Sequence, residues 1–163
     1  MRKVGKYFAM FLLCVLLTSC ASKDLLSDTS IINYGLNETV YFEDLAITAK
    51  EIVELSPLEN DFIEIEKGEA HVSVRFEIEN ISDDDESVTS LGMFKAYADG
   101  EEADLSLMGT AVYDKEIIDG TLNAGESKTG WFTVKVPREW KELVIFVKSG
   151  VIANDYVKFT FKN

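Results

Sequence analysis

The stretch "AHVSVRFEIEN", residues 70–80, alternates apolar and polar side chains with a period of two. This period is typical of a strand with one buried face, because successive side chains of a strand point to opposite sides of the sheet. The side chains on the predicted inward face are Ala70, Val72, Val74, Phe76 and Ile78. A shift of one residue would bury the charged side chains of the other face, so the stretch predicts a strand whose register is strongly specified.

The same alternation occurs on both sides of this strand. It is found in "DLAITA" (44–49), "WFTVKV" (131–136) and "YVKFTF" (156–161). The segment "ELVIFV" (142–147) is apolar on both faces, which predicts a central strand covered on both sides. Residues 104–115 fit the strand pattern least and predict either a long loop or a short helical turn.

Turn residues lie between these segments. Asp99-Gly100, Asp119-Gly120 and residues 123–125 (Asn-Ala-Gly) each predict a tight turn, because Gly accepts the positive φ that such turns need. Several short strands separated in this way predict an all-β fold, a β-sandwich of about seven or eight strands.

The N-terminus is typical of an export signal. Arg2, Lys3 and Lys6 precede an apolar run of eleven residues, 7–17. A helix needs about 20 apolar residues to cross the hydrocarbon core, so a permanent membrane span is not expected. The run ends in small residues, as the cleavage site of a secretory signal does.

Residues 17–20, "LTSC", resemble the lipobox of bacterial lipoproteins. In that family a diacylglycerol is joined to the cysteine thiol, and the chain is cut before the cysteine. The resemblance implies a signal peptide over 1–19 and a mature chain that begins at lipidated Cys20, anchored at the extracytoplasmic face of the cell membrane. Cys14 would leave with the signal, so the mature fold would have no disulfide.

A tether is predicted between the anchor and the domain. The predicted boundaries are 20–39 for the lipidated N-terminus and tether, and 40–163 for the sandwich domain. If flexible, the eighteen residues 21–38 would have an end-to-end distance of about 21–25 Å. The alternative is that part of the tether docks on the domain through its apolar members, which are Leu25, Leu26, Ile31, Ile32 and Leu36.

The chain is acidic. Its 163 residues contain 16 Lys and Arg and 29 Asp and Glu, which gives a formal charge of −13. Residues 1–19 contain three of the basic side chains and none of the acidic ones, so the mature chain would carry −16. Such a surface is repelled by nucleic acid and by anionic headgroups, so we expect no nucleic-acid partner and membrane contact through the lipid alone.

Few residues are candidates for a site. The acidic run Asp83, Asp84, Asp85 and Glu86 could form a weak calcium site, although it lacks the EF-hand spacing, and a solvated acidic loop is the alternative. A second acidic group, Glu101, Glu102 and Asp104, follows the Asp99-Gly100 turn. We predict no catalytic residue, no resident metal and no cofactor.

The aromatic and histidine candidates are also few. Trp131 and Trp140 are candidates for a contact surface, because exposed tryptophan often marks one, and packing beneath a loop is the alternative for Trp131. His71 is the single histidine, and its place on the polar face predicts a surface position.

Four blocks of sequence resemble a known family. "VSVRFEIENIS", "FKAYADGEEAD", "LNAGESKTGWFTVKVP" and "WKELVIFV" are similar to the successive blocks of a family of bacterial surface lipoproteins with a domain of unknown function. The similarity covers roughly residues 40–161. It implies an immunoglobulin-like sandwich, likened to telokin and to a secreted immunoprotective antigen, and the family has no agreed activity to carry across.

The sequence thus predicts a non-enzymatic binding or interaction module held outside the membrane, whose partner is an unidentified envelope protein or ligand. Two alternatives stay open. One is an envelope hydrolase that uses a pair of acidic residues, and the other is a calcium-responsive surface module.

Overall fold

Strand β4 (Glu69–Asn80) forms where the alternating stretch predicts it, and it lies inside a four-stranded sheet. The computed structural model describes residues 25–56, 68–113 and 115–163. β4 pairs antiparallel with β3 (Leu45–Leu55) on one side and with β9 (Ser127–Pro137) on the other. β2 (Thr39–Phe42) pairs with β3 and gives the order β2-β3-β4-β9.

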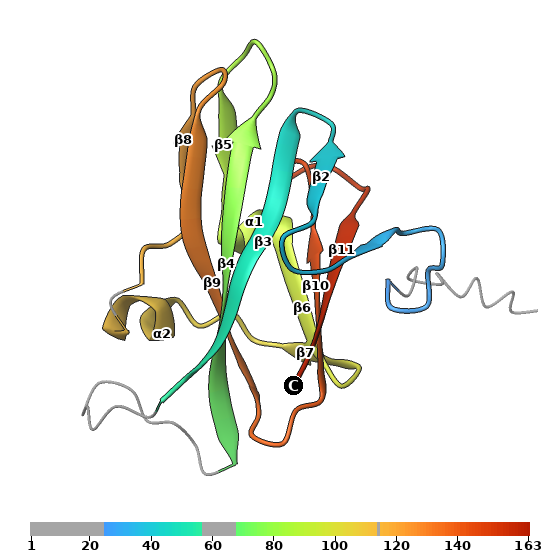
Figure 1. Ribbon diagram of the computed structural model, residues 1–163, viewed down its shortest axis with the longest axis vertical. Helices are drawn as coiled ribbons and strands as arrows, with labels where there is room; N and C mark the ends of the chain where they lie inside the picture. The colour runs from blue at the N-terminus through green and yellow to red at the C-terminus, as the bar shows by residue number, and fades with distance from the viewer. Residues whose placement is uncertain (1–24, 57–67, 114) are drawn as a thin grey trace, which may run out of the picture.

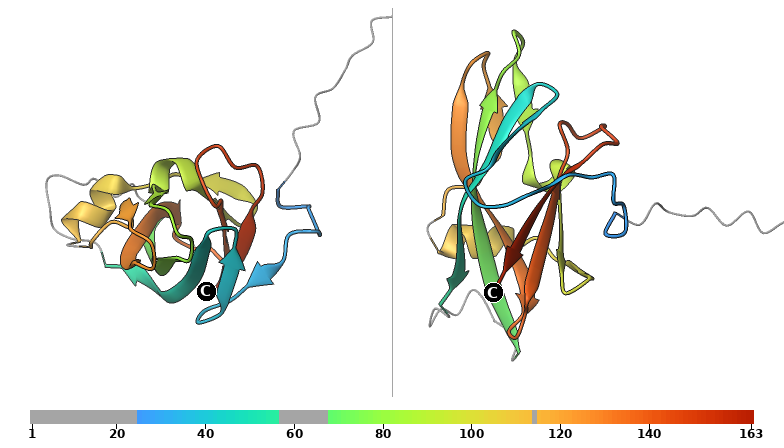
Figure 2. Two further views of the ribbon diagram at one scale, coloured as in Figure 1. Left: turned by 90° about the horizontal axis from the view of Figure 1, so that it is seen from above. Right: turned by 45° about the vertical axis from the view of Figure 1, so that its right-hand side comes forward.

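A five-stranded sheet packs against the first, and the two layers are visible in Figures 1 and 2. Its strands, in spatial order, are β1 (Asn33–Tyr34), β11 (Val157–Lys162), β10 (Glu142–Val147), β6 (Phe94–Ala98) and β7 (Glu101–Ala103). The central position of β10 confirms the prediction from its two apolar faces.

The predicted β-sandwich is confirmed, with more strands than the seven or eight expected. A third, two-stranded sheet pairs β5 (Glu86–Val88) with β8 (Gly120–Leu122). Like β1 and β7, these strands are two or three residues long, too short to show an alternating pattern in the sequence.

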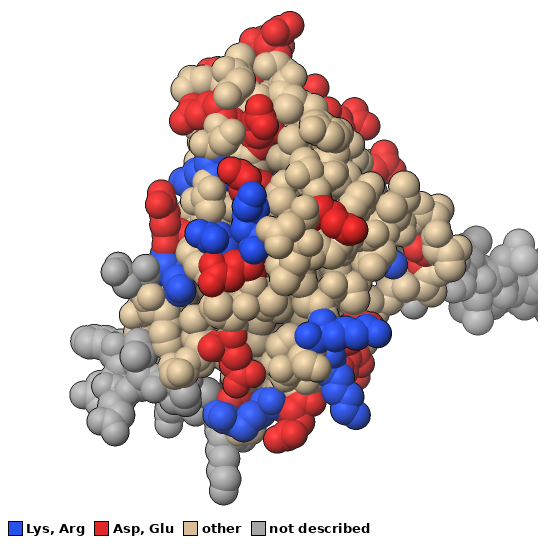
Figure 3. Space-filling model, viewed as in Figure 1, with Lys and Arg blue, Asp and Glu red and all other residues tan. Residues whose placement is uncertain are grey.

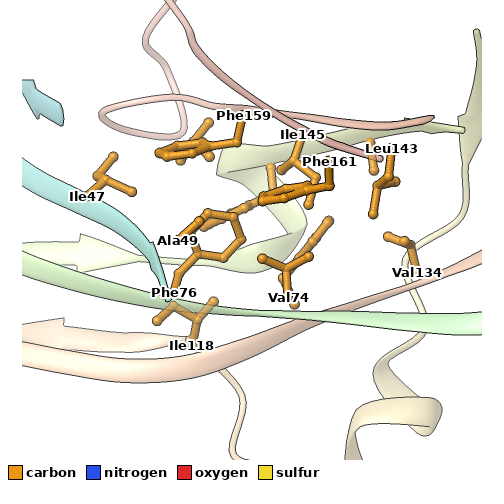
Figure 4. Packing of buried hydrophobic residues seen from close by; sticks show 14 of the residues in the cluster. Ile47, Ala49, Val74, Phe76, Ile118, Val134, Leu143, Ile145, Phe159 and Phe161 are labelled. Carbon is orange, nitrogen blue, oxygen red and sulfur yellow. The ribbon is translucent and has the colours of Figure 1, made fainter. Parts of the chain in front are cut away.

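The inner faces of the two main sheets form the core (Figure 4). The ring of Phe76 in β4 lies 5.4 Å from the rings of both Phe94 and Phe159, which belong to the opposite sheet. Phe94 also stacks on Phe132 of β9 at 5.0 Å. All five side chains predicted on the inner face of β4 are buried, as the period of two requires.

Strand β3 contains a bulge that changes which of its side chains face inward. The register with β4 shifts between Ala49 and Glu51, so Lys50 has no partner in the ladder. Beyond the bulge Leu55 pairs with His71, on the outer face, although Leu45 in the same strand points into the core. A bulge inserts one residue and so reverses the alternation that follows it.

Two short helices lie between the strands. α2 (Leu107–Val112) confirms the helical alternative for residues 104–115 and packs on β9. The side chain of Ser106 caps it by accepting a hydrogen bond from the Gly109 N–H. α1 (Ser90–Met93) leads directly into β6.

Two of the three predicted turns are confirmed. Asp99 and Gly100 both have positive φ and join β6 to β7, and Gly125 has φ +75 between β8 and β9. The prediction of a tight turn at Asp119-Gly120 is wrong. Gly120 begins β8, and an Asp119 carboxylate oxygen instead accepts a hydrogen bond from the Ser90 N–H at the start of α1.

The N-terminal segment docks on the sandwich. β1 pairs in parallel with β11, and the Asn37 N–H donates to the Ala49 carbonyl at 2.8 Å. The fold therefore begins before residue 40, and the predicted flexible tether over 21–38 is corrected for its described part, because apolar side chains and backbone bonds hold it. Cys20 and the rest of 1–24 lie outside the described residues. Within the described part, neither helix is long and apolar enough to span a membrane.

We predict that Gly130→Ala destabilises the fold. A Cβ at this position in β9 would lie 2.5 Å from the Ile118 Cα and 2.6 Å from the Ile118 nitrogen, where the segment after α2 crosses β9. Because those atoms are backbone, the strand must move, at a cost of about 1–3 kcal/mol. Gly150→Ala is the matched control, since a Cβ there meets nothing within 4 Å. Urea unfolding of both variants measures the difference, and equal stabilities would contradict the prediction.

Candidate functional site

A groove lies between the docked N-terminal segment, β2 and the loop that joins β10 to β11. Its volume is about 540 Å³, within the range of small-molecule sites. Most of its lining is apolar or aromatic and includes Leu25, Ile31, Ile32, Tyr34, Tyr41 and Tyr156. We call it the strap groove, and residues 25–34 the strap.

The strap is held in place by its contacts with the last strand. Asn33 and Tyr34 pair with Lys158 and Phe159, and the Thr160 hydroxyl donates to the Asn33 side-chain oxygen at 2.6 Å. The Tyr34 ring lies 5.9 Å from the ring of Phe159. One wall of the groove therefore comes from the start of the described chain and another from its end.

Polar groups in the groove are few. Lys95, Asn154 and Asp155 line it together with Ser30. The Lys148 ammonium, beside the groove, lies 5.3 Å from the centre of the Tyr156 ring, a distance suited to a cation–π contact. This composition suits an apolar or aromatic group with one polar end.

Of the predicted cation-binding residues, Asp83, Asp84 and Asp85 lie in the loop after β4, and Glu86 begins β5. Asn80, which is buried, shapes this loop: its amide group donates to the carbonyls of Asp84 and Leu122 at 2.6 and 3.0 Å. Its side-chain oxygen accepts from both the N–H and the hydroxyl of Ser82. Across the described ranges, no three His, Cys, Asp or Glu residues are placed to hold a metal ion. The loop that contains Asp83, Asp84 and Asp85 is thus positioned by an amide side chain.

The second acidic group lies elsewhere. Glu101, Glu102 and Asp104 line a hollow of about 420 Å³ with Glu69 and Lys135. The hollow adjoins β7 and the ends of β4 and β9, so the structure does not bring these acids to the loop after β4.

The two tryptophans have different environments. Trp140 is buried in the core cluster, and its indole N–H donates to a Glu54 carboxylate oxygen at 3.3 Å. The prediction that Trp140 forms a contact surface is therefore wrong: Pro137 ends β9, and the turn that follows folds the indole inward. Trp131 is half-buried, with the Lys115 ammonium 4.0 Å and the Arg75 guanidinium 5.7 Å from its ring centre. These cations already contact the ring.

His71 is buried, with 1% of its surface exposed, so the predicted surface position is wrong. As predicted, the His71 side chain points to the outer face of the sheet. It is buried there because α2 covers that part of the outer face. Tyr113 packs edge-on against the imidazole at 6.1 Å, and Leu55 is its neighbour on β3. Next to it, Ser73, Thr133 and Thr110 join their hydroxyls through two hydrogen bonds of 2.8 Å.

The buried imidazole has a lowered pKa. Removal from water is the main cause, the charge of Lys135 lowers the pKa further, and Glu69 opposes both. Neither ring nitrogen has a hydrogen-bond partner among the described residues. The neutral form is therefore the one that the fold accepts.

The fold defines the protein as a β-sandwich domain, and the strap groove is a hollow on its surface. The chain belongs to the family described as a domain of unknown function, DUF4352, whose sequence profile matches residues 34–157. The sequence matches no curated protein.

Solved structures of other bacterial proteins share the fold. The chain is 14% identical to ycdA, a proposed lipoprotein of Bacillus subtilis, with a TM-score of 0.61 over 76% of this chain and 38% of ycdA. It is 14% identical to yjhA of Bacillus subtilis, with a TM-score of 0.60 over 79% and 98% of the two chains. The chain is 14% identical to the secreted protein MPT63 of Mycobacterium tuberculosis, with a TM-score of 0.56 over 82% of this chain and 98% of MPT63. At such identities the likeness shows the fold alone.

We predict that Asn80→Ala destabilises the protein by about 2–3 kcal/mol, because it takes the amide partner from the carbonyl of buried Leu122 and from the Asp84 carbonyl of the loop. Asn123→Ala is the comparison: Asn123 is exposed, and its amide donates to a Glu126 carboxylate oxygen at 2.6 Å, so its loss should cost about 0.5–1.5 kcal/mol. Thermal unfolding measures both changes.

Repeating the melt of the unmodified protein in millimolar calcium tests the cation-site prediction, since a bound ion would raise the Tm.

We predict that stability falls as the pH is lowered below 6.5. The unfolded chain binds a proton at His71 near its ordinary pKa of 6.5, and the folded chain resists that proton because its pKa is lowered. The loss should begin near pH 6.5 and continue down to the folded pKa. His71→Phe should flatten the dependence between pH 7.5 and 5.5, as measured by urea unfolding. Parallel pH profiles for the two proteins would refute this role.

Proposed function

We propose that the protein is a lipoprotein, anchored through Cys20 at the extracytoplasmic face of the cell membrane, and that it acts there as a non-enzymatic binding module. On this proposal its sandwich is of the immunoglobulin-like type. The strap groove is its contact surface, and the partner is an envelope component: a protein, a polymer or a lipid.

The groove is the observation that carries the proposal. Apolar and aromatic side chains line most of it, and Tyr41 at its edge is 76% exposed. Exposed aromatic side chains around a hollow are typical of binding surfaces. The basic start, short apolar run and lipobox-like end of residues 1–20 support the anchor.

The acidic groups favour binding over hydrolysis. Hydrolysis of a glycosidic bond by a carboxyl pair needs two such groups facing one bond. Among the described residues that line the groove, Asp155 supplies the one carboxyl group. The hollow lined by Glu69, Glu101, Glu102 and Asp104 contains Lys135 and no aromatic ring for a sugar to stack on. A further hollow, lined by Asp99 and Glu142, likewise has no aromatic ring in its lining.

The anchor is tested by Cys20→Ala. We expect the unmodified protein in its native cells to fractionate with membranes and the variant to leave them, because the variant has no thiol to acylate. Mass measurement of the N-terminal peptide should show a diacylglycerol on Cys20. A variant that stays with the membrane fraction would argue against anchoring by lipid.

The contact surface is tested by photo-cross-linking in the same cells. A benzophenone side chain at Tyr41 should give a defined adduct, whereas the same group at Met108 should give none. Met108 is a suitable control because it is 59% exposed and lies on α2, away from the groove. Identical patterns from both positions would remove the groove from the proposal.

A further inference from the structure

Five exposed apolar side chains lie in or near the strap groove, and we call them the apolar rim: Ile32, Tyr41, Leu91, Val151 and Ile152. Ile32 and Tyr41 line the groove itself, and a separate exposed group, Leu107, Met108 and Ile117, lies in and after α2. Ile152 is 94% exposed and Leu91 77% exposed. Large apolar side chains that face water together mark a contact surface.

The rim comes from four parts of the chain, which are the strap, β2, α1 and the β10–β11 loop. Ile32 and Tyr41 line the groove with Asn154 and Asp155, which belong to the same β10–β11 loop as Val151 and Ile152. That loop touches α1, because a Cβ on Gly92 would lie 2.9 Å from a methyl carbon of Val151. The loop and the strap lie on the same side of the sandwich in both views of Figure 2.

The acidic character of the chain is weak on this side. In Figure 3 acidic residues lie over the upper end, the left side and the lower end of this face, while the surface beside the strap at the right is mostly uncharged. The acidic residues of the strap and of the groove lining are Asp28 and Asp155. Two lysines adjoin the rim: Lys95 lines the groove, and the Lys148 ammonium contacts the Tyr156 ring. The overall charge of −13 therefore does not describe the rim.

The distance from the anchor to the strap is short. Four residues lie between Cys20 and Leu25, which lines the groove, so five Cα-to-Cα steps join the two. Even fully extended, they reach about 18 Å. Strand β4, with twelve residues, is about 40 Å long. A lipid at Cys20 would therefore keep the strap side of the sandwich close to the bilayer.

We propose that the apolar rim rests on the lipid bilayer, so that the partner of the strap groove is membrane lipid. This inference rests on the proposed anchoring at Cys20. Val151 and Ile152 enter the boundary between headgroups and acyl chains, as the apolar faces of interfacial helices do. Tyr41 lies at headgroup level, where aromatic side chains with a polar end are enriched. The sandwich then lies on the membrane with α2 facing away.

The test uses the full-length lipidated protein in phosphatidylcholine vesicles. Cys14 leaves with the signal and the thiol of Cys20 is acylated, so an introduced cysteine would be the one free thiol of the mature chain. A polarity-sensitive fluorophore is attached to the introduced cysteine of the Ile152→Cys variant. The matched control is the Met108→Cys variant, labelled in the same way on α2. Both positions are exposed, so neither substitution should disturb the core.

We expect the probe at position 152 to emit at shorter wavelength than the probe at 108, and to be quenched severalfold more by nitroxide-labelled lipid. Equal quenching at both positions, in protein that floats with the vesicles, would overturn the bilayer contact and leave the anchored binding module standing. Protein that carries no lipid and does not float would overturn both proposals together. Flotation and the mass of the N-terminal peptide separate these outcomes.

Discussion

The fold depends on the burial of one face of β4. This strand has a partner on each side for almost its whole length, so its register fixes those of β3 and β9. Phe76 reaches across the sandwich and contacts Phe94 and Phe159, which belong to β6 and β11 of the other sheet. Leu143 and Ile145 of β10 complete the inner layer (Figure 4). Replacing such a ring by Ala would typically cost about 3–5 kcal/mol, a large share of the stability of a domain of this size.

The alternating pattern predicted the inner layer well and the outer layer poorly. The alternation of apolar and polar residues was enough to predict which side chains of β4 point inward, and those side chains are buried in the core. His71 and Ser73 have the predicted parity, yet α2 covers them, and no local pattern reveals which outer face a distant helix will cover. The bulge at Lys50 likewise reverses the alternation within β3.

The candidate site could be predicted only in part, because it is built from segments far apart in the chain. The apolar residues of the strap indicated that it could dock. Its partner could not be inferred, since parallel pairing of Asn33 and Tyr34 with β11 joins residues more than 120 positions apart. The acidic loop was visible in the sequence, but the role of Asn80 as its organiser was not. A buried Asn at the end of a strand, followed by Ser two residues later, was the available signal.

The pairing of β1 with β11 also has a mechanical consequence. It consists of two residue pairs at the edge of a sheet, whereas β2 and the strands beyond it are joined by longer ladders. Tension applied to the chain at residue 25 would therefore separate β1 from β11 before the force reached the other strands of the sandwich. Residues 25–38 could then extend to a span of at most about 50 Å. The groove would lose its strap wall in the same event, so tension on the N-terminus and the state of the groove are coupled through this one short strand.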